Sequence, residues 1–264
     1  MSGKLYLCAT PIGNLEDITL RVLRTLKEVD LIAAEDTRNS IKLLNHFEIK
    51  TPMTSYHEYN KIEKAYTLIE KMQNGMNIAL ITDAGTPGIS DPGEELAAMC
   101  YEAGIEVTSL PGPAACITAL TLSGLPTRRF AFEAFLPMDK KERKEVLEEL
   151  VNETRTIILY EAPHKLVRTL RDLRETLGNR RMTLCRELTK KRTPWHRTAY
   201  FSQASHNARV TGFLSRESCT LHRLFPWLSY TSGCPCTSAP VLPSDHHHRR
   251  LRLLPDPVHE DFPA

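Results

Sequence analysis

The stretch that decides the fold is residues 78–93, which read IALITDAGTPGISDPG. It opens with an apolar run over residues 78–81 and continues into a loop, residues 83–93, that contains three glycines and two prolines. A short apolar run bounded by turn residues is typical of a strand that is buried on both faces of a parallel sheet. In such sheets, ligands bind where the strands end and the loops lead into helices. The stretch therefore predicts a buried strand followed by a ligand-binding loop.

On both sides of this strand, short apolar runs alternate with segments of helical periodicity. The expected strands are residues 5–9, 31–34, 78–81 and 105–110, and the expected helices are residues 18–29, 41–47, 62–72, 96–101 and 114–122. This alternation predicts a mostly parallel sheet that is covered by helices on both faces. We therefore expect an α/β fold whose first domain spans residues 1–124 and ends near Pro126.

A second set of elements follows a boundary near residues 124–128. Strands are expected at residues 130–136, 156–160 and 181–185, and helices at 140–151 and 165–177. Residues 125–191 therefore predict the start of a second, mixed α/β domain, which is incomplete here.

The character of the chain changes after Lys191. Residues 192–264 contain no lysine, yet they hold seven of the ten histidines and eight of the seventeen prolines. Apolar residues there follow neither the helical nor the strand period for long. We expect an irregular or disordered tail, and two interpretations stay open: a disordered extension, or translation in a wrong reading frame.

Composition sets limits on the class of protein. Hydrophobic residues make up 41% of the chain, and no apolar stretch approaches the length of a membrane span. The seven cysteines are scattered and do not form a disulfide framework, and the first residues show no signal-peptide pattern. We therefore expect a cytoplasmic protein without a membrane segment.

Charge is informative only when the chain is divided. Residues 1–191 carry 26 Lys+Arg against 27 Asp+Glu, so this part is close to neutral. Binding to RNA would then depend on local basic clusters. One such cluster comprises Arg186, Lys190, Lys191 and Arg192, and an RNA-phosphate contact and a solvated strand edge are equally good interpretations of it.

Glycine, proline and acidic residues concentrate in the loops that follow the expected strands, at residues 10–17, 35–38, 83–93 and 111–113. The dinucleotide-binding and P-loop glycine patterns are both missing. The loops carry instead an acidic rim made of Asp17, Glu35, Asp36 and Asp83. This combination suits a cationic ligand that has no phosphate, and S-adenosylmethionine is such a ligand.

Five segments, residues 9–19, 34–38, 83–93, 111–113 and 160–164, together resemble the tetrapyrrole-methylase superfamily, and within it the ribosomal RNA small-subunit methyltransferase I group. The resemblance implies a two-domain fold with S-adenosylmethionine in the cleft between the domains, and a homodimer. It also implies 2′-O-methylation of a cytidine ribose in the decoding centre of 16S rRNA, within the small ribosomal subunit. The chain departs from the group at Tyr59, where a histidine is expected, and after Lys191.

Methyl transfer to a ribose hydroxyl benefits from a nearby group that takes up the hydroxyl proton. The candidate bases are Glu35, Asp36 and Glu161, and Arg38 is expected to position a phosphate. His57 and His164 are weaker candidates, because a lone histidine is more often a surface or core residue. The residues expected to bind the cofactor are Pro11, Asp83, Ala84, Gly85, Gly88, Ile89, Ser90, Gly112, Pro113, Ala115 and Tyr160.

No metal site is expected, since Cys234 and Cys236 with residues 246–248 match no standard zinc spacing. Two alternatives to the RNA methyltransferase stay open. One is a small-molecule methylase of the same superfamily that acts on a tetrapyrrole. The other is an inactive, truncated product that cannot close its cleft.

Overall fold

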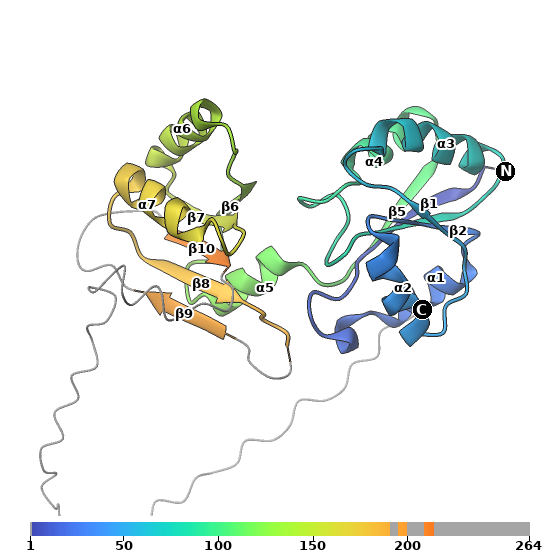
Figure 1. Ribbon diagram of the computed structural model, residues 1–264, viewed down its shortest axis with the longest axis horizontal. Coiled ribbons are helices and arrows are strands. Elements are labelled where there is room, and N and C mark those ends of the chain that lie inside the picture. The colour runs from blue at the N-terminus through green and yellow to red at the C-terminus, as the bar shows by residue number, and fades with distance from the viewer. Residues whose placement is uncertain (1, 191–194, 200–208, 214–264) are drawn as a thin grey trace, which may run out of the picture.

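The computed structural model describes residues 2–190, 195–199 and 209–213. It contains two five-stranded sheets, which form separate bodies joined by the segment between β5 and α5 (Figure 1). Both bodies combine a sheet with helices, so the expected two-domain α/β fold is confirmed.

The first sheet has the order β3-β2-β4-β1-β5 and all of its pairs are parallel. Its strands are β1 (Lys4–Cys8), β2 (Leu31–Ala34), β3 (Met53–Ser55), β4 (Ile78–Ile81) and β5 (Glu106–Leu110). Strand β3 was not expected, because three residues are too few to show a period. It forms through backbone pairing with β2 alone, at the edge of the sheet.

Helices cover both faces of this sheet, as Figure 1 shows for the right-hand body. Helices α1 (Leu20–Glu28) and α2 (Thr37–His46) lie on one face, and α3 (Lys61–Gln73) and α4 (Glu94–Glu102) lie on the other. A short 3-10 helix, η1 (Leu15–Asp17), precedes α1. Helix α1 begins where the Thr19 hydroxyl accepts a hydrogen bond from Val22 N at 3.2 Å. That oxygen satisfies one of the free amides of the first turn.

Successive residues of the central strands point to opposite faces. In β2, Leu31 and Ala33 pack in the core beneath α3 and α4, whereas Ile32 and Ala34 pack in the core beneath α1 and α2. Both sets are buried. This double burial explains why these strands are apolar throughout instead of alternating.

The second sheet has the order β6-β7-β10-β8-β9. Its strands are β6 (Phe130–Phe135), β7 (Thr156–Tyr160), β8 (Met182–Arg186), β9 (Trp195–Ala199) and β10 (Arg209–Phe213). Only β9 runs antiparallel to its neighbour, and the other pairs of this sheet are parallel. Helices α6 (Lys140–Glu149) and α7 (Leu166–Leu177), with the 3-10 turn η2 (Leu150–Asn152), cover one face.

Helix α5 (Ala115–Leu122) covers the other face of the second sheet, which moves the expected domain boundary. Cys116 and Leu120 pack against Ile158, and Ala119 packs against Cys185. We expected this helix in the first domain because it follows β5 in the strand-helix alternation. Tertiary packing decides otherwise, and the chain passes from one body to the other at residues 111–114, before α5 and not after it.

The expected end of the second domain at residue 191 is also corrected. Strand β10 lies between β7 and β8 and pairs with both in parallel, while β9 extends the sheet beyond β8. These ten residues are therefore not irregular: β10 pairs with two strands and β9 with one, although neither segment has a clear period of its own. The other residues of the expected tail lie outside the described part of the chain.

Candidate active site

The loops that follow β1 and β4 leave the first sheet in opposite directions. The chain passes from β1 to α1 on one face and from β4 to α4 on the other, although β1 and β4 are neighbours in the sheet. Such a divergence opens a crevice at the carboxyl ends of the strands, where open α/β sheets bind their ligands. Here the two loops are joined by a pair of backbone hydrogen bonds, Thr10 N to Gly85 O at 2.8 Å and Gly85 N to Thr10 O at 3.0 Å.

Glycines in these loops allow the loops to approach one another. A Cβ on Gly112 would lie 2.6 Å from the Cβ of Ala9 in the β1 loop, and within the β4 loop a Cβ on Gly93 would lie 2.9 Å from Gly88 N. The Thr86 hydroxyl donates to Pro113 O at 3.0 Å. The nearest neighbour of Gly112 is Ala9 in the β1 loop. The loops after β1, β4 and β5 thus form one connected surface.

Three carboxylates gather at this edge. Glu35, directly after β2, accepts a hydrogen bond from Asp83 N through Oε2 at 3.2 Å. Burial raises the pKa of Glu35, and the charges of Asp83 and Asp36 raise it further. Burial, followed by the charges of Glu35 and Asp83, raises the pKa of Asp91 to about 6. Asp91 belongs to the predicted loop but was not singled out, because a carboxyl pKa depends on neighbours that the sequence does not reveal.

Asp36 and Arg38 form a salt bridge with each other. Asp36 caps α2 by accepting from Arg38 N at 2.8 Å, and its other oxygen pairs with the Arg38 guanidinium, also at 2.8 Å. These hydrogen bonds lower the pKa of Asp36 to about 2. A carboxylate held so firmly in its charged form is a weak proton acceptor.

His57 follows β3 at the same edge of the sheet. Its Nδ1 atom is buried and has no hydrogen-bond partner in the described part of the chain. The imidazole acts on Glu35 and lowers the pKa of that carboxyl, against the larger effect of burial. Sequence alone offers no reason to prefer one histidine over the other. In the structure, His57 lies near the carboxylates, whereas His164 is exposed to solvent.

Tyr160, at the end of β7, connects the second sheet to α5. Its hydroxyl oxygen accepts a hydrogen bond from Cys116 N at 3.0 Å, in the first turn of a helix whose N-cap residue, Ala114, supplies no side-chain bond. The Tyr160 ring packs edge-on against Phe132 and Phe135, with centroids 5.1 and 5.6 Å away. Burial raises the pKa of Tyr160, and Asp91 in the first domain contributes to this effect.

Glu161 is held in place by hydrogen bonds within the second domain. Its Oε1 accepts from Ala162 N at 2.7 Å and its Oε2 accepts from the Thr169 hydroxyl. That hydroxyl in turn accepts from Arg143 Nη2 at 2.8 Å, and the buried Arg143 pairs with Asp172 at 2.7 Å. Both Glu161 oxygens are therefore used to hold the loop after β7, and this network does not reach Glu35.

A cavity of about 220 Å³ lies beside α2, between the β1 loop and the end of β4. The Asn39 amide spans part of it, donating to Asp83 Oδ2 at 2.9 Å. The cavity is lined by Thr10, Pro11, Leu15, Asn39, Ser40, Lys42, Leu43, Thr82 and Asp83. Two of the residues expected to bind the cofactor, Pro11 and Asp83, thus lie at its wall.

The remaining residues expected to bind the cofactor lie along the β4 loop and at the start of α5. Ala84, Ile89 and Ser90 are exposed, and Ser90 adopts the left-handed backbone conformation with φ 66°. Ala115 is the first residue of α5. All of them border the same crevice, but which of them touch a cofactor stays a prediction.

The second domain reaches the β1 loop at Gly13. A Cβ on Gly13 would lie 3.2 Å from both the Thr189 hydroxyl and Lys190 Cγ. Its φ of +141° is in the region that favours glycine. Residues 189–190 therefore close one side of the crevice.

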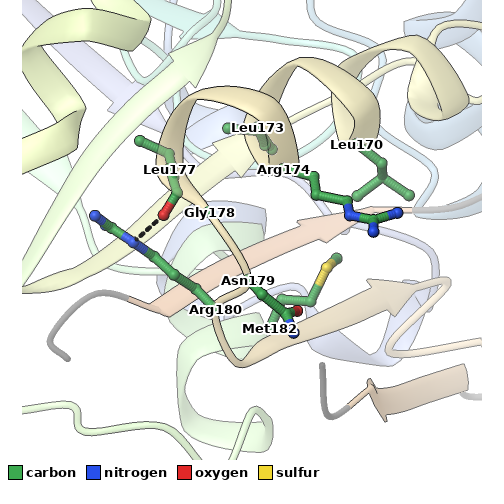
Figure 2. Close-up of a pocket in the computed structure, with 8 residues that line it drawn as sticks. All are labelled: Leu170, Leu173, Arg174, Leu177, Gly178, Asn179, Arg180 and Met182. Atoms are coloured by element: carbon green, nitrogen blue, oxygen red, sulfur yellow. Dashed lines mark hydrogen bonds between the residues drawn. The ribbon is translucent and has the colours of Figure 1, made fainter. Parts of the chain in front are cut away.

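A second hollow is separate from this site. It lies at the turn from α7 to β8, where Leu170, Leu177 and Met182 provide apolar walls and Arg180 Nε donates to Leu177 O at 2.8 Å (Figure 2). Its volume of about 30 Å³ is much smaller than that of the cavity beside α2, which makes it a poorer candidate for a cofactor or nucleotide site.

Within residues 2–190, 195–199 and 209–213, no cluster of three or more His, Cys, Asp or Glu residues is arranged to hold a metal ion. In the same residues, no helix has the length and apolar character needed to cross a membrane.

Comparison with known proteins gives consistent results for sequence and fold. A family model described as Tetrapyrrole (Corrin/Porphyrin) Methylases matches residues 4–198. The chain is 58% identical over 189 residues to a protein of Synechocystis sp. named Ribosomal RNA small subunit methyltransferase I, covering 71% of this chain and 68% of that protein. Proteins of the same name from Halalkalibacterium halodurans and Haemophilus influenzae are 55% and 54% identical, over 71% and 72% of this chain and 65% and 68% of theirs.

The chain thus spans only 65–68% of the length of these relatives. Among solved structures, uroporphyrin III C-methyl transferase from Thermus thermophilus aligns with a TM-score of 0.55 at 19% identity, covering 75% of this chain and 89% of that one. Diphthine synthase aligns with a TM-score of 0.55 at 15% identity, covering 66% and 72%. These structures support the fold.

Sequence, fold and the crevice at the β1–β4 divergence agree with one another. This chain belongs to the tetrapyrrole (corrin/porphyrin) methylase family.

Proposed function

We propose that this protein methylates RNA of the small ribosomal subunit, with S-adenosylmethionine as the methyl donor. The finer assignment is the 2′-hydroxyl of a cytidine ribose in the decoding centre of 16S rRNA. The observation that carries the proposal is the group of carboxylates at the switch point between β1 and β4, in a chain whose relatives are named for this substrate. A homodimer in the cytoplasm is part of the same proposal.

The residues at the crevice fit S-adenosylmethionine. When bound, this cofactor supplies a methyl group from a positively charged sulfonium. Asp83 and Asp91 provide negative charge, and no glycine-rich phosphate cradle is present in the β1 loop. Gly85, with φ +97°, pairs with Thr10 of the β1 loop through two backbone hydrogen bonds, and the neighbouring Ala84 is exposed. The cofactor would lie along residues 83–91 and 112–115, on the side that faces Tyr160.

Glu35 is the candidate base that the geometry favours. Asp36 is held charged by Arg38, and both oxygens of Glu161 are already hydrogen-bonded. Glu35 is partly buried, and its pKa is raised above the ordinary value for glutamate. A general base works best when its pKa lies near the working pH, so this shift favours Glu35 as the base. Its Oε atoms would take the proton of the ribose hydroxyl, with Asp83 N holding one of them in place.

The test uses purified protein with labelled S-adenosylmethionine and either small ribosomal subunits or a uroporphyrinogen. Label in 16S rRNA, located to one cytidine and resistant to alkali as a 2′-O-methyl group, would support the proposal. Label in the tetrapyrrole would replace it with the small-molecule activity. No transfer to either acceptor, with the cofactor bound, would indicate an inactive product.

The Glu35→Gln and Asp36→Asn variants test the base. We expect Glu35→Gln to slow single-turnover methylation at least about a hundredfold, the usual contribution of a general base, with cofactor affinity within about threefold. Asp36→Asn should act mainly on helix α2 and slow the reaction less. Equal single-turnover rates for wild-type protein and Glu35→Gln would remove Glu35 from this role.

A further inference from the structure

The two helical faces of the first domain carry opposite charge, although residues 1–191 are nearly neutral as a whole. Helices α1 and α2 contain one acidic residue, Glu28, and five basic ones: Arg21, Arg24, Lys27, Arg38 and Lys42. Helices α3 and α4 contain three lysines, and five acidic residues outnumber them: Glu63, Glu70, Glu94, Glu95 and Glu102. Net positive charge is thus concentrated on the α1–α2 face.

Most of this charge is available to a partner. Arg21, Arg24 and Lys27 are exposed, and none of them forms an ion pair with another described residue. Of the five cations on these two helices, Arg38 is the one that a described carboxylate neutralises, through Asp36. On the opposite face Lys61 is bound by both Glu58 and Glu95, so the available cations there are fewer.

The cavity of about 220 Å³ is lined by residues of α2, one of the two helices of this face. Lys42, which also has no ion pair in the described residues, lines it from α2, while Asp83 lines it from the end of β4. Asp83 N holds Glu35 at 3.2 Å, so the cavity ends beside the candidate base. A cation at one wall and a carboxylate at the other suit a group that combines an anion with a hydroxyl, and a nucleotide's phosphate and ribose are such a group.

We propose that the α1–α2 face is the surface on which the RNA substrate docks, with the target nucleotide entering the cavity beside α2. This inference rests on the proposed function and names where its substrate binds. Arg21, Arg24 and Lys27 contact phosphates of the flanking chain, and Lys42 contacts a phosphate next to the target ribose. The cofactor occupies the other side of the Thr10–Gly85 bridge, toward Tyr160, so the two ligands approach Glu35 from opposite sides.

The experiment measures binding of small ribosomal subunits at several salt concentrations. The triple variant Arg21→Gln/Arg24→Gln/Lys27→Gln should reduce the slope of log affinity against log salt by about 0.7–0.9 for each phosphate that the protein no longer neutralises. At about 0.1 M salt, affinity should fall about tenfold or more. Lys42→Gln alone should reduce the slope by about 1 and raise KM for subunits. Cofactor affinity, measured by calorimetry, should stay unchanged in both variants and shows that they are folded.

Helix α6 provides the control Lys140→Gln/Lys141→Gln/Lys144→Gln, which removes the same charge from exposed positions on the second domain, where Lys141 and Lys144 form surface ion pairs with Glu145 and Glu148. Its salt slope should equal that of the wild type. An unchanged slope in the α1 variant, or an equal decrease in the α6 variant, would overturn the docking surface. Wild-type protein that binds subunits without methylating them would contradict the proposed function. In that case the salt slopes of the variants would still show whether the subunits bind at the α1–α2 face.

Discussion

At the scale of single residues, the site depends on how closely backbone segments approach one another. Gly112 is the clearest case, because a methyl group there would occupy the space of the Ala9 methyl group, 2.6 Å away. The backbone of Gly112 is not in the left-handed region, so the constraint is steric and not conformational. The contact fixes the β5 loop against the β1 loop at the entrance to the crevice.

We expect Gly112→Ala to lower the free energy of unfolding by about 1–3 kcal/mol, the typical cost of an overpacked contact. It should also weaken cofactor binding, because the β1 and β5 loops would move apart. The double variant Ala9→Gly/Gly112→Ala moves the methyl group from one loop to the other and should restore most of the stability and of the affinity. Urea unfolding and calorimetry measure the two effects, and an absence of recovery would mean that Gly112 acts in another way.

Asp91 gives the protein a dependence on pH. Its pKa in the folded protein is about 6, above the usual value for aspartate of about 3.9, since burial and the charges of Glu35 and Asp83 favour the protonated form. A raised carboxyl pKa contributes stability that is fully present below about pH 4 and is lost as the pH rises through about 6. At neutral pH the charged Asp91 therefore destabilises the folded protein.

Asp91→Asn should consequently raise Tm at pH 7.5, and the difference from wild type should shrink at pH 4.5. Thermal unfolding of both proteins at the two pH values measures this difference. The comparison cancels the acid destabilisation that other carboxylates cause in both proteins. A difference that does not depend on pH would show that Asp91 titrates normally.

At the scale of elements, α5 has the most unexpected position. Its sequence is apolar on all sides, so its periodicity could not show which sheet it covers. Its N-terminus lies beside the first domain's loops, while its body packs on the second sheet. The Thr183 hydroxyl fixes its other end by donating to Ser123 O at 2.9 Å. Helix α5 therefore orients one half of the crevice relative to the other.

Tyr160→Phe should weaken the attachment of α5 to β7 without disturbing the packing of the aromatic rings. The phenylalanine ring still packs against Phe132 and Phe135 but lacks the oxygen that accepts from Cys116 N. Removal of a capping acceptor costs about 0.5–2 kcal/mol. Chemical denaturation measures this cost, and amide exchange at Cys116 should become faster. If exchange at Cys116 does not change, the hydroxyl does not cap α5.

At the scale of the whole molecule, the second domain depends on a strand that comes late in the chain. Strand β10 separates β7 from β8, so without it neither strand has its inner neighbour. Their backbone N–H and C=O groups would then be left unpaired within the sheet. A chain that ended at residue 191 would not complete this sheet.

Truncation tests this dependence. A chain of residues 1–213 keeps both sheets, whereas residues 1–199 keep β9 but lack β10. We expect the shorter chain to retain a protease-resistant first domain, residues 4–110, and to be cleaved throughout the second. Limited proteolysis with mass spectrometry identifies the fragments. Equal resistance of the second domain in both chains would show that β10 is dispensable.

The sequence by itself determined the elements whose burial leaves a pattern. Continuous apolar runs revealed β2 and β4, since both of their faces are covered, and the Gly- and Pro-rich loops revealed the ligand-binding edge. Those signals are local, because each strand and its loop are adjacent in the chain. They were enough to give the α/β class, the loops of the site and the resemblance to a family.

Tertiary structure alone decided what depends on neighbours far apart in the chain. It assigned α5 to the second sheet, inserted β10 between β7 and β8, and distinguished Glu35 from Asp36 and Glu161 by their partners. A period of apolar residues shows that a segment has a buried face, but not which surface covers it. A carboxylate's pKa and availability follow from burial and from hydrogen bonds between distant segments, and those exist only in the folded chain.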